Sequence, residues 1–302
     1  MSGVTLAVHP GALGDVLLAI PALRALRSGV DAPLALAAQP RIGALLAALG
    51  VVEHALDFDT LGLDALFVDE PACRPRLPAV ERLVCWFGAR DSVFVRRLTA
   101  LVPNAVVAPS LVPGRPVWEH LLATLDAPTG AWCMPVGVPD AVRAEGAAAL
   151  ARAGFDGPRP WLVVHPGAGS AAKCWPAEAF ARTITTLAAR ARLNVVVHVG
   201  PADAAAAATL RRHLGAGVAW LESPSLPALA GALAHATIYV GNDSGVSHLA
   251  AALGVPSLVL FDPRHLAWRP WWAGARVQTV TLTRTVSDEV AAVVNELEAM
   301  LR

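Results

Sequence analysis

Three short segments place polar side chains beside glycine, in the way that α/β proteins bind anions and move protons. The first, from Gly11 to Leu26 (GALGDVLLAIPALRAL), follows an apolar stretch that predicts a strand. Gly11 and Gly14 let the chain turn, and Asp15 falls at the start of the next predicted helix. A helix amino end favours an ionised carboxylate, the form that a general base needs. Asp15 is therefore a candidate general base; the alternative is that it only caps the helix.

The second segment runs from His165 to Pro176 (HPGAGSAAKCWP). Gly167 and Gly169 allow backbone amides to approach an anion, and Pro176 opens a helix whose amino end faces the same space. Lys173, the only lysine in the chain, can add a full positive charge beside a phosphate. The alternative is an ordinary solvated lysine. The segment matches neither the Walker motif nor the dinucleotide-binding glycine motif.

The third segment runs from Tyr239 to Phe261 (YVGNDSGVSHLAAALGVPSLVLF). Asp243 or Ser244 is expected to cap a helix that starts near Gly245 and ends at Gly254. His248 lies four residues beyond Ser244, so both side chains project from one helical face near the amino end. Amides, a hydroxyl and an imidazole in this arrangement can hold a diphosphate. The alternative is a capped helix whose histidine packs on the sheet.

Short apolar runs alternate with longer amphipathic ones along the whole chain, which predicts βαβ units and parallel sheets. A proline- and glycine-rich passage interrupts this pattern, so we expect a first domain over residues 1–155, a second over 156–285 and a final helix over 286–302. Pro21 is expected to kink the first helix. The expected strands are 4–8, 34–38, 51–58, 83–86, 105–108, 161–165, 194–199, 237–240 and 257–261. The expected later helices are 42–49, 140–153, 176–192, 204–214, 226–234, 245–253 and 287–300.

The composition excludes several classes of protein. Among the 302 residues, twenty-four basic residues balance twenty-four acidic ones. The chain therefore has no net positive charge that would attract nucleic acid or anionic lipid non-specifically. Four scattered cysteines without a C-x-x-C pair indicate neither a disulfide framework nor a zinc site. No signal peptide or membrane span is recognisable, which predicts a cytoplasmic protein with at most peripheral membrane contact.

The three segments together resemble glycosyltransferase family 9, the heptosyltransferases of the lipopolysaccharide core. The resemblance lies in G-x-x-G-D-x-[LV], H-P-G-[AS]…K-x-W-P and D-[ST]-G-x-x-H-L-A-A-A-L, in that order. It implies a GT-B fold: two Rossmann-like domains facing a cleft, with the C-terminal helix packing back on the N-terminal domain. It also implies sugar transfer with inversion, from ADP-heptose to a lipopolysaccharide-core or related glycan or glycolipid, at or near the cytoplasmic face of the inner membrane. Neither a metal nor another cofactor is expected.

By this resemblance Asp15 is the catalytic base, Lys173 contacts the donor diphosphate, and the remaining donor residues are Gly167, Asp243, Ser244, Gly245 and His248. Asp203 stands near the position where the family offers an acidic residue to the ribose. The family's Gly-Pro-Thr has become Phe261-Asp262-Pro263 here, which leaves the sugar and nucleobase open. Further candidates are Gly14 and Arg264, and, for an acidic or phosphorylated acceptor, Arg74, Arg76, Arg82, Arg96 and Arg97.

Some features remain open at this point. Asp57 and Asp59 match a D-x-D pattern that holds a divalent ion in another glycosyltransferase fold, but a solvated strand edge is favoured over a metal site. Trp268, Trp271 and Trp272, with Arg264, His265 and Arg269, are equally compatible with a rim of the donor site and with a packed surface lid. Two other functions also fit the same architecture: a nucleotide-sugar epimerase and a non-catalytic nucleotide-binding module.

Overall fold

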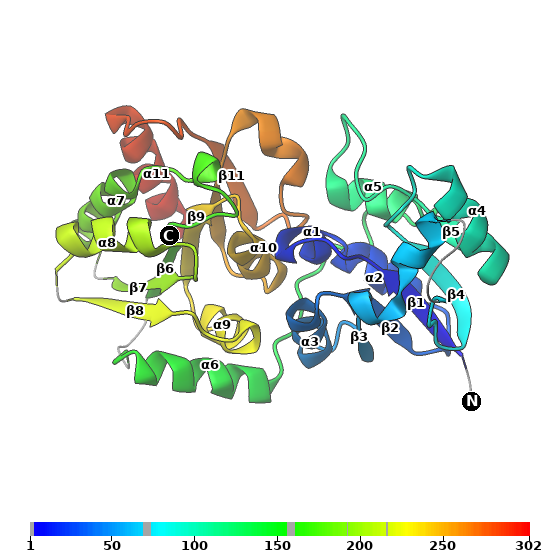
Figure 1. The fold of residues 1–302 in the computed structure, drawn as a ribbon. Helices are drawn as coiled ribbons and strands as arrows, with labels where there is room; N and C mark the ends of the chain where they lie inside the picture. Colours follow the sequence, from blue (N-terminus) through cyan, green and yellow to red (C-terminus); the bar gives the residue numbers. More distant parts are fainter. Residues whose placement is uncertain (1–2, 69–73, 156–160, 192, 216) are drawn as a thin grey trace. The chain divides into compact units, whose positions relative to one another are not determined.

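The computed structural model describes residues 3–68, 74–155, 161–191, 193–215 and 217–302. The chain divides into two compact units, Met1–Cys133 and Met134–Arg302, and each contains its own parallel sheet (Figure 1). Each unit, taken by itself, is one Rossmann-like domain, which confirms the prediction of two such domains in the chain. No helix in the described part of the chain is long and apolar enough to cross a membrane.

The first unit contains a five-stranded sheet in the order β3-β2-β1-β4-β5. Its strands are β1 (Val4–Val8), β2 (Leu34–Ala38), β3 (His54–Asp57), β4 (Val80–Cys85) and β5 (Val106–Val107). Its helices are α1 (Leu13–Leu18), α2 (Ile20–Arg27), α3 (Pro40–Ala48), α4 (Ser92–Leu101) and α5 (Val117–Ala123), with 3-10 turns η1 (Phe58–Leu61) and η2 (Leu63–Phe67). Leu6, Val8 and Leu83 of the central strands pack with the fully buried Phe94 of α4.

Proline breaks the first predicted helix into α1 and α2. The break lies at Ala19, and Pro21 occupies the first turn of α2, where it needs no hydrogen-bond donor of its own. The expected kink is therefore confirmed: one helix ends and the next begins just before Pro21.

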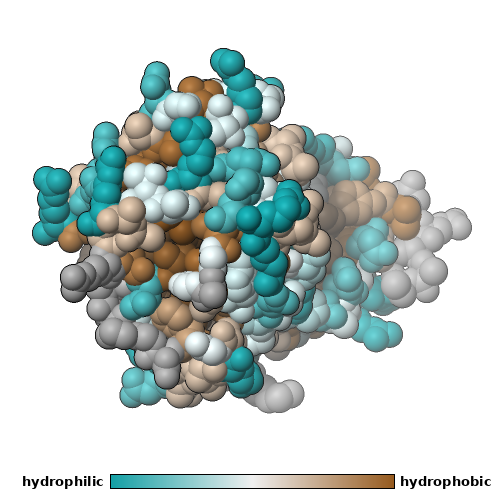
Figure 2. All heavy atoms as spheres, turned by 90° about the vertical axis from the view of Figure 1, so that its left-hand side faces the viewer, coloured by the Kyte–Doolittle hydropathy of each residue, from teal (hydrophilic) through white to brown (hydrophobic). Residues whose placement is uncertain are grey.

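The second unit contains a six-stranded sheet in the order β11-β10-β9-β6-β7-β8. Its strands are β6 (Trp161–His165), β7 (Asn194–Val199), β8 (Val218–Glu222), β9 (Ile238–Asn242), β10 (Ser257–Phe261) and β11 (Ala275–Thr279). Its helices are α6 (Asp140–Arg152), α7 (Ala177–Arg190), α8 (Ala204–His213), α9 (Leu226–Leu233), α10 (Gly245–Ala252) and α11 (Ser287–Met300), with η3 (Ala171–Lys173) and η4 (Pro263–Trp268). Figure 2 views this unit from the side of α7 and α8 and shows hydrophilic side chains around a smaller apolar area.

The second unit begins earlier in the chain than the expected second domain. Helix α6 was expected in the first domain, but it belongs to the second unit and packs on α9. The two helices touch directly at Gly146, where a Cβ would lie 2.1 Å from the backbone of Gly231. The expected boundary at 155/156 borders residues 156–160, which lie outside the described residues, as does Arg192 at the end of the expected helix 176–192.

Helix α11 packs against α7 within the second unit. Its apolar face, Val290, Val293, Val294 and Leu297, is buried in the core that contains Trp175 and Phe180. The helical spacing of these side chains predicted that one face is buried, but it did not identify the surface that covers it.

Candidate functional site

The second and third segments meet because their strands are neighbours. Strand β6 pairs with β9, with His165 opposite Gly241, and the strand order reverses between these two strands. In open α/β sheets ligands bind at the carboxyl edge where the order reverses. Gly241 permits the close approach, since a Cβ there would lie 2.3 Å from the Tyr239 hydroxyl and 2.9 Å from the His165 carbonyl oxygen.

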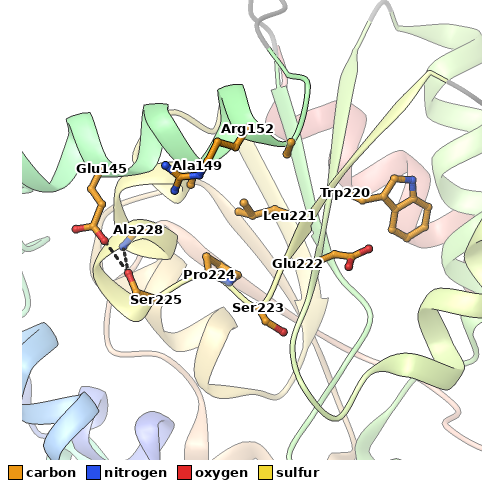
Figure 3. Close-up of a pocket in the computed structure, with 11 residues that line it drawn as sticks. Glu145, Ala149, Arg152, Trp220, Leu221, Glu222, Ser223, Pro224, Ser225 and Ala228 are labelled. Carbon is orange, nitrogen blue, oxygen red and sulfur yellow. Dashed lines mark hydrogen bonds between the residues drawn. The ribbon is translucent and has the colours of Figure 1, made fainter.

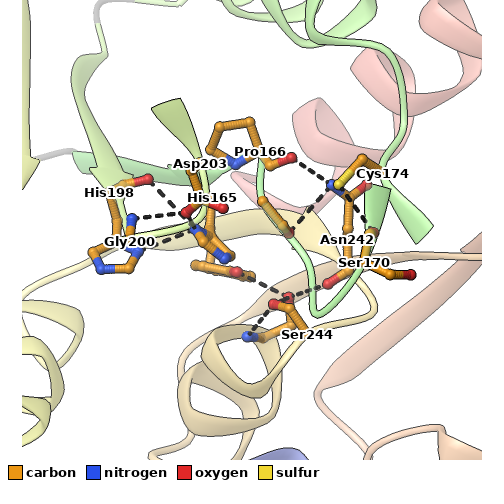
Figure 4. A network of polar contacts seen from close by, with 12 residues as sticks. His165, Pro166, Ser170, Cys174, His198, Gly200, Asp203, Asn242 and Ser244 are labelled. Carbon is orange, nitrogen blue, oxygen red and sulfur yellow. Dashed lines mark hydrogen bonds and ion pairs between the residues drawn. The ribbon is translucent and has the colours of Figure 1, made fainter. Parts of the chain in front are cut away.

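Asn242 holds the two loops together. Its Nδ2 donates to the carbonyl oxygen of Pro166 at 2.7 Å, and its Oδ1 accepts from the amide of Trp175 at 2.9 Å. The side chain is fully buried, so these bonds are shielded from water. Figure 4 shows Asn242 between the two ends of the segment that contains Pro166, Ser170 and Cys174. Sequence reasoning passed over Asn242, although it directly precedes the predicted Asp243.

Lys173, Asp243 and His248 form one charged cluster. Lys173 Nζ donates to Asp243 Oδ2 at 2.8 Å, and His248 Nε2 lies 3.5 Å from Asp243 Oδ1. Asp243 and His248 are buried, whereas the Lys173 side chain is 31% exposed and can still be reached by a ligand. Burial alone would raise the pKa of Asp243, but hydrogen bonds from His248 and Lys173 outweigh it and lower that pKa. Asp243 therefore stays ionised and orients two nitrogen donors.

The amino end of α10 lies beside this cluster. Ser244 is the N-cap, and its Oγ accepts from the amide of Ser247 at 3.3 Å, so Ser244 rather than Asp243 fills the predicted capping role. Ser247 Oγ donates to the carbonyl oxygen of Asn242 at 2.5 Å and lies 2.8 Å from the Tyr239 hydroxyl. Gly245 opens the helix, whose first amides and dipole favour an anion at this end.

Asp203 has a structural role in this chain. Its Oδ2 accepts from the amide of Gly200 at 2.7 Å, and the carboxyl group is buried against Gly167. A Cβ on Gly167 would lie 2.0 Å from Asp203 Oδ1, so the glycine is required for this contact. Gly167 thus lets the segment after β6 pack on the turn after β7.

Two buried histidines that the sequence did not single out adjoin Asp203. The Nδ1 atoms of His165 and His198 lie 3.0 Å apart, and His165 Nδ1 is 3.7 Å from Asp203 Oδ2 (Figure 4). Burial lowers the pKa of His165, partly opposed by Asp203. Burial, reinforced by His165, holds the pKa of His198 well below its ordinary value. Both rings are therefore neutral near pH 7.

The segment after β10 contributes an exposed pair and one aromatic contact. Arg264 donates to both carboxylate oxygens of Asp262, at 2.9 and 2.6 Å, and its side chain is 81% exposed. Lys173 Nζ lies 6.0 Å from the centre of the Trp268 ring, within range of a cation–π contact. Trp271 is buried, Trp272 packs over Gly274, and Trp268 contacts Lys173, a predicted donor residue.

In the first unit, Asp15 lies in the first turn of α1, after the carboxyl end of β1. The N-cap is Ala12, which corrects the alternative that Asp15 occupies the cap position. Asp15 is half-buried beside Gly11, where a Cβ would lie 3.0 Å from the Asp15 Cβ and 2.7 Å from His9 Cε1. Burial lowers the pKa of His9, and the nearby Asp15 opposes this shift. His9 is a neighbour of Asp15 that sequence reasoning missed.

The other charged residues predicted for a site in the first unit are the aspartates of the D-x-D pattern and the acceptor arginines. Asp57 Oδ1 accepts from the amide of Asp59 at 3.1 Å, which is a turn cap. Within the described residues, no group of three or more histidine, cysteine or acidic side chains is arranged to hold a metal ion. Arg97 donates to the carbonyl oxygens of Leu66 and Val68. The other four arginines predicted for the acceptor, Arg74, Arg76, Arg82 and Arg96, are exposed.

A cavity of about 620 Å³ lies at the carboxyl end of the edge strand β8. Figure 3 shows Arg152 of α6 above Leu221 and Pro224, with Trp220 and Glu222 to the right and Ser225 to the left. Ser225 Oγ donates to Glu145 Oε1 at 2.7 Å and accepts from the amide of Ala228 at 3.1 Å, so this hydroxyl joins α6 to the start of α9. The lining combines polar and apolar groups, as small-molecule sites do.

Comparison with known proteins identifies the class. The family model of glycosyltransferase family 9 (heptosyltransferase) matches residues 122–293. Lipopolysaccharide heptosyltransferase 3 of Escherichia coli is 32% identical over 131 residues, 38% of this chain and 37% of that protein, so the match spans little more than a third of this relative. The chain belongs to glycosyltransferase family 9.

Solved structures of the same kind share the fold over almost the whole chain. The E. coli ADP-heptose lipopolysaccharide heptosyltransferase II superposes with a TM-score of 0.77 at 19% identity, covering 99% of this chain and 98% of that one. The E. coli heptosyltransferase WaaC with ADP-2-deoxy-2-fluoro heptose gives a TM-score of 0.65 at 18% identity, covering 97% and 99%. The predicted fold class is therefore confirmed.

Proposed function

We propose that the chain is an inverting glycosyltransferase that moves a sugar, a heptose from ADP-heptose, to a hydroxyl group of a lipopolysaccharide-core or related glycan. The observation that supports this most is the cluster of Lys173, Asp243 and His248 beside the amino end of α10. A lysine, an imidazole and helix amides at one place match the charge of a diphosphate leaving group. Under this proposal the chain works in the cytoplasm, in peripheral contact with a glycolipid acceptor.

The diphosphate is expected to lie between the loops after β6 and β9. Asp243 keeps Lys173 and His248 in fixed positions, so little rearrangement is needed when negative charge develops on the leaving phosphate. Gly245 exposes the first helix amides to the same oxygens. The nucleoside is expected to extend along the sheet edge toward the ends of β7 and β8, where the cavity of about 620 Å³ lies.

Asp15 supplies the base in this proposal. Its carboxylate takes the proton from the acceptor hydroxyl while that oxygen attacks the anomeric carbon, and the bond from this carbon to the diphosphate breaks in the same step. One displacement inverts the anomeric centre. Asp15 lies in the first turn of α1, after the carboxyl end of β1, where ligands of α/β sheets bind.

Two solved relatives support the choice of donor. One solved relative is named an ADP-heptose heptosyltransferase, and another was solved with ADP-2-deoxy-2-fluoro heptose. The chain's own motifs resemble the same family, and we carry this donor to it as a proposal.

The experiment incubates the full chain with ADP-heptose, with and without a deacylated lipopolysaccharide-core acceptor, and follows products by mass spectrometry. The proposal predicts ADP and a heptose-extended acceptor, formed only when both substrates are present. Conversion of the sugar nucleotide to an isomer without acceptor would show an epimerase instead. Binding of ADP with no turnover under either condition would indicate a non-catalytic nucleotide-binding module.

A further inference from the structure

His9 directly follows β1 and lies in the turn that leads to Asp15. The amide of His9 donates to the carbonyl oxygen of Ala37 at 2.9 Å, so its backbone is still bonded to the neighbouring strand β2. The ring is 2% exposed, and its centre lies 5.9 Å from that of the buried Trp86. His9 is therefore a buried polar side chain at the carboxyl end of the strand that precedes the proposed base.

One ring nitrogen of His9 holds this turn. Nδ1 accepts a hydrogen bond from the amide of Gly11 at 3.3 Å, two residues further along the chain. Asparagine and aspartate side chains make the same bond in an Asx-turn. A ring nitrogen that accepts a hydrogen bond carries no proton, so the ring is the neutral tautomer with its hydrogen on Nε2.

Gly11 brings the ring of His9 and the side chain of Asp15 together. A Cβ on Gly11 would lie 2.7 Å from His9 Cε1 and 3.0 Å from the Asp15 Cβ, so both side chains lie against this glycine. Gln39, which follows β2, donates to the carbonyl oxygen of Gly11 at 3.3 Å. The turn before Asp15 is thus held at the Gly11 amide by His9 and at the Gly11 carbonyl oxygen by Gln39.

The other ring nitrogen shows that packing alone does not account for a histidine at this position. His9 Nε2 is buried and has no hydrogen-bond partner among the described residues. Burial of an unpaired donor costs free energy, and an apolar side chain of similar size would avoid that cost. The acceptor at Nδ1 is what the histidine provides here and an apolar residue would not.

We propose that His9 is a positioning residue for Asp15: its unprotonated Nδ1 holds the amide of Gly11 and keeps the turn in the shape that presents the carboxylate to the reacting hydroxyl. The inference rests on the proposed function, in which Asp15 is the general base. A general base acts only within hydrogen-bond reach of the proton that it takes, so the turn decides whether Asp15 can act. His9 itself touches no substrate in this role.

The role of His9 makes the turn sensitive to pH. A proton on Nδ1 converts the acceptor into a donor and breaks the bond from Gly11. Burial lowers the pKa of His9, and the Asp15 carboxylate opposes this shift, so the ring is neutral near pH 7 and becomes protonated in acid. Cys85, the titratable group at the end of the neighbouring β4, is a neutral thiol because burial raises its pKa to about 12.

The first test compares the rate–pH profiles of the wild type, His9→Asn and His9→Leu. Wild-type kcat should fall in acid more steeply than one proton allows, because protonation of either His9 or Asp15 stops the reaction. His9→Asn keeps an acceptor for the Gly11 amide but does not titrate, so it should keep a near-normal plateau and an acid limb of slope one. His9→Leu should lower kcat about 10- to 100-fold with the KM for ADP-heptose unchanged.

His54→Asn, which removes an exposed histidine of β3 in the same unit, is the matched control and should keep the wild-type profile. A wild-type acid limb of slope one would overturn the proposal, as would a plateau kcat in His9→Leu equal to that of the wild type. Failure of His9→Asn to recover the activity that His9→Leu loses would also overturn it.

Nitrogen NMR of the histidine rings gives a second readout that needs no turnover. The His9 signal, assigned by its absence in His9→Asn, should show the tautomer protonated at Nε2 in the wild type at pH 8. The pKa of His9 should fall in Asp15→Asn, because the carboxylate no longer favours the imidazolium. The opposite tautomer, or a His9 pKa that Asp15→Asn leaves unchanged, would overturn the proposal even where sugar transfer is observed. A chain that gives the expected NMR result without transferring sugar would instead remove the proposed function, and the positioning role with it, but not the turn that His9 holds.

Discussion

The two candidate regions of the molecule are built differently. Around Lys173, buried side chains tie the loops together: Asn242 joins the segment after β6 to β9, and Asp243 holds both Lys173 and His248. Around Asp15, helix α1 spans six residues and begins at Leu13, after the N-cap Ala12, which provides no side-chain cap. A rigid arrangement suits a group that must meet a developing charge, whereas a general base needs only proton access and an ionised carboxylate. The predictions below test this division of roles.

The largest expected effect is on turnover in Asp15→Asn. The amide has the size of the carboxylate but cannot accept the proton, so we expect turnover to fall by about 10²- to 10⁴-fold. ADP affinity and melting temperature should stay near wild-type values, because Asp15 is not the N-cap of α1. Steady-state kinetics with calorimetry of ADP checks both. Asp64→Asn, an exposed carboxylate of the same unit, is the control, and near-normal turnover in Asp15→Asn would remove the base assignment.

The next effect in size is on nucleotide binding in Lys173→Ala. Loss of the charge that Asp243 orients should weaken ADP about 10- to 100-fold. Lys173→Arg keeps the charge and should recover most of the affinity, which separates ligand binding from local unfolding. Arg284→Ala, an exposed arginine of the same unit, should bind ADP normally. If Lys173→Ala binds ADP as tightly as the wild type, the diphosphate lies elsewhere.

A smaller effect concerns stability and pH. Because the folded-state pKa values of His165 and His198 are lowered, the unfolded chain binds protons more readily below about pH 6.5. Stability should therefore be greatest above that pH and fall as the pH drops, by at most about 1.4 kcal/mol per histidine and pH unit.

Thermal melts of the wild type and His198→Phe at pH 7.5 and 5.5 test this expectation. The wild type should lose several degrees, and His198→Phe should lose fewer because one buried titrating group is gone. The exposed histidine variant His213→Asn should behave like the wild type. Identical losses in all three proteins would mean that the buried pair does not control the acid response.

Much of the fold could be predicted from the sequence, because buried central strands consist of unbroken apolar runs. Residues 162–164, 195–197 and 258–261 are such runs, and each lies in the strand expected. The expectations omitted the edge strands β8 and β11, whose residues are mostly part-exposed; β11 also lacks an apolar run. Helical periodicity predicted a buried face on α11, but it could not show that Trp175 and Phe180 belong to the core that covers this face.

The residues of the candidate site also divide into those that the sequence predicted and those that it did not. Lys173, Asp243, Ser244 and His248 were predicted from glycine, capping and charge signals, and they meet in the structure. Asn242 and the His165–His198 pair were missed, because their importance comes from contacts between strands distant in sequence. Asp203, which is expected at a ribose, accepts a hydrogen bond from the amide of Gly200 in the turn after β7, and its role toward a ribose stays a prediction.

The measurement that tests the account most directly is calorimetric titration of the wild-type chain with ADP and AMP in the presence of EDTA. The account holds that Lys173, His248 and the amino end of α10 bind the diphosphate without a metal ion. It predicts that ADP affinity is unchanged by the chelator and that ADP binds at least about 10-fold more tightly than AMP, because the second phosphate gains charge-assisted hydrogen bonds. Loss of ADP binding in EDTA with recovery on adding magnesium or manganese, or equal affinities for ADP and AMP, would contradict it.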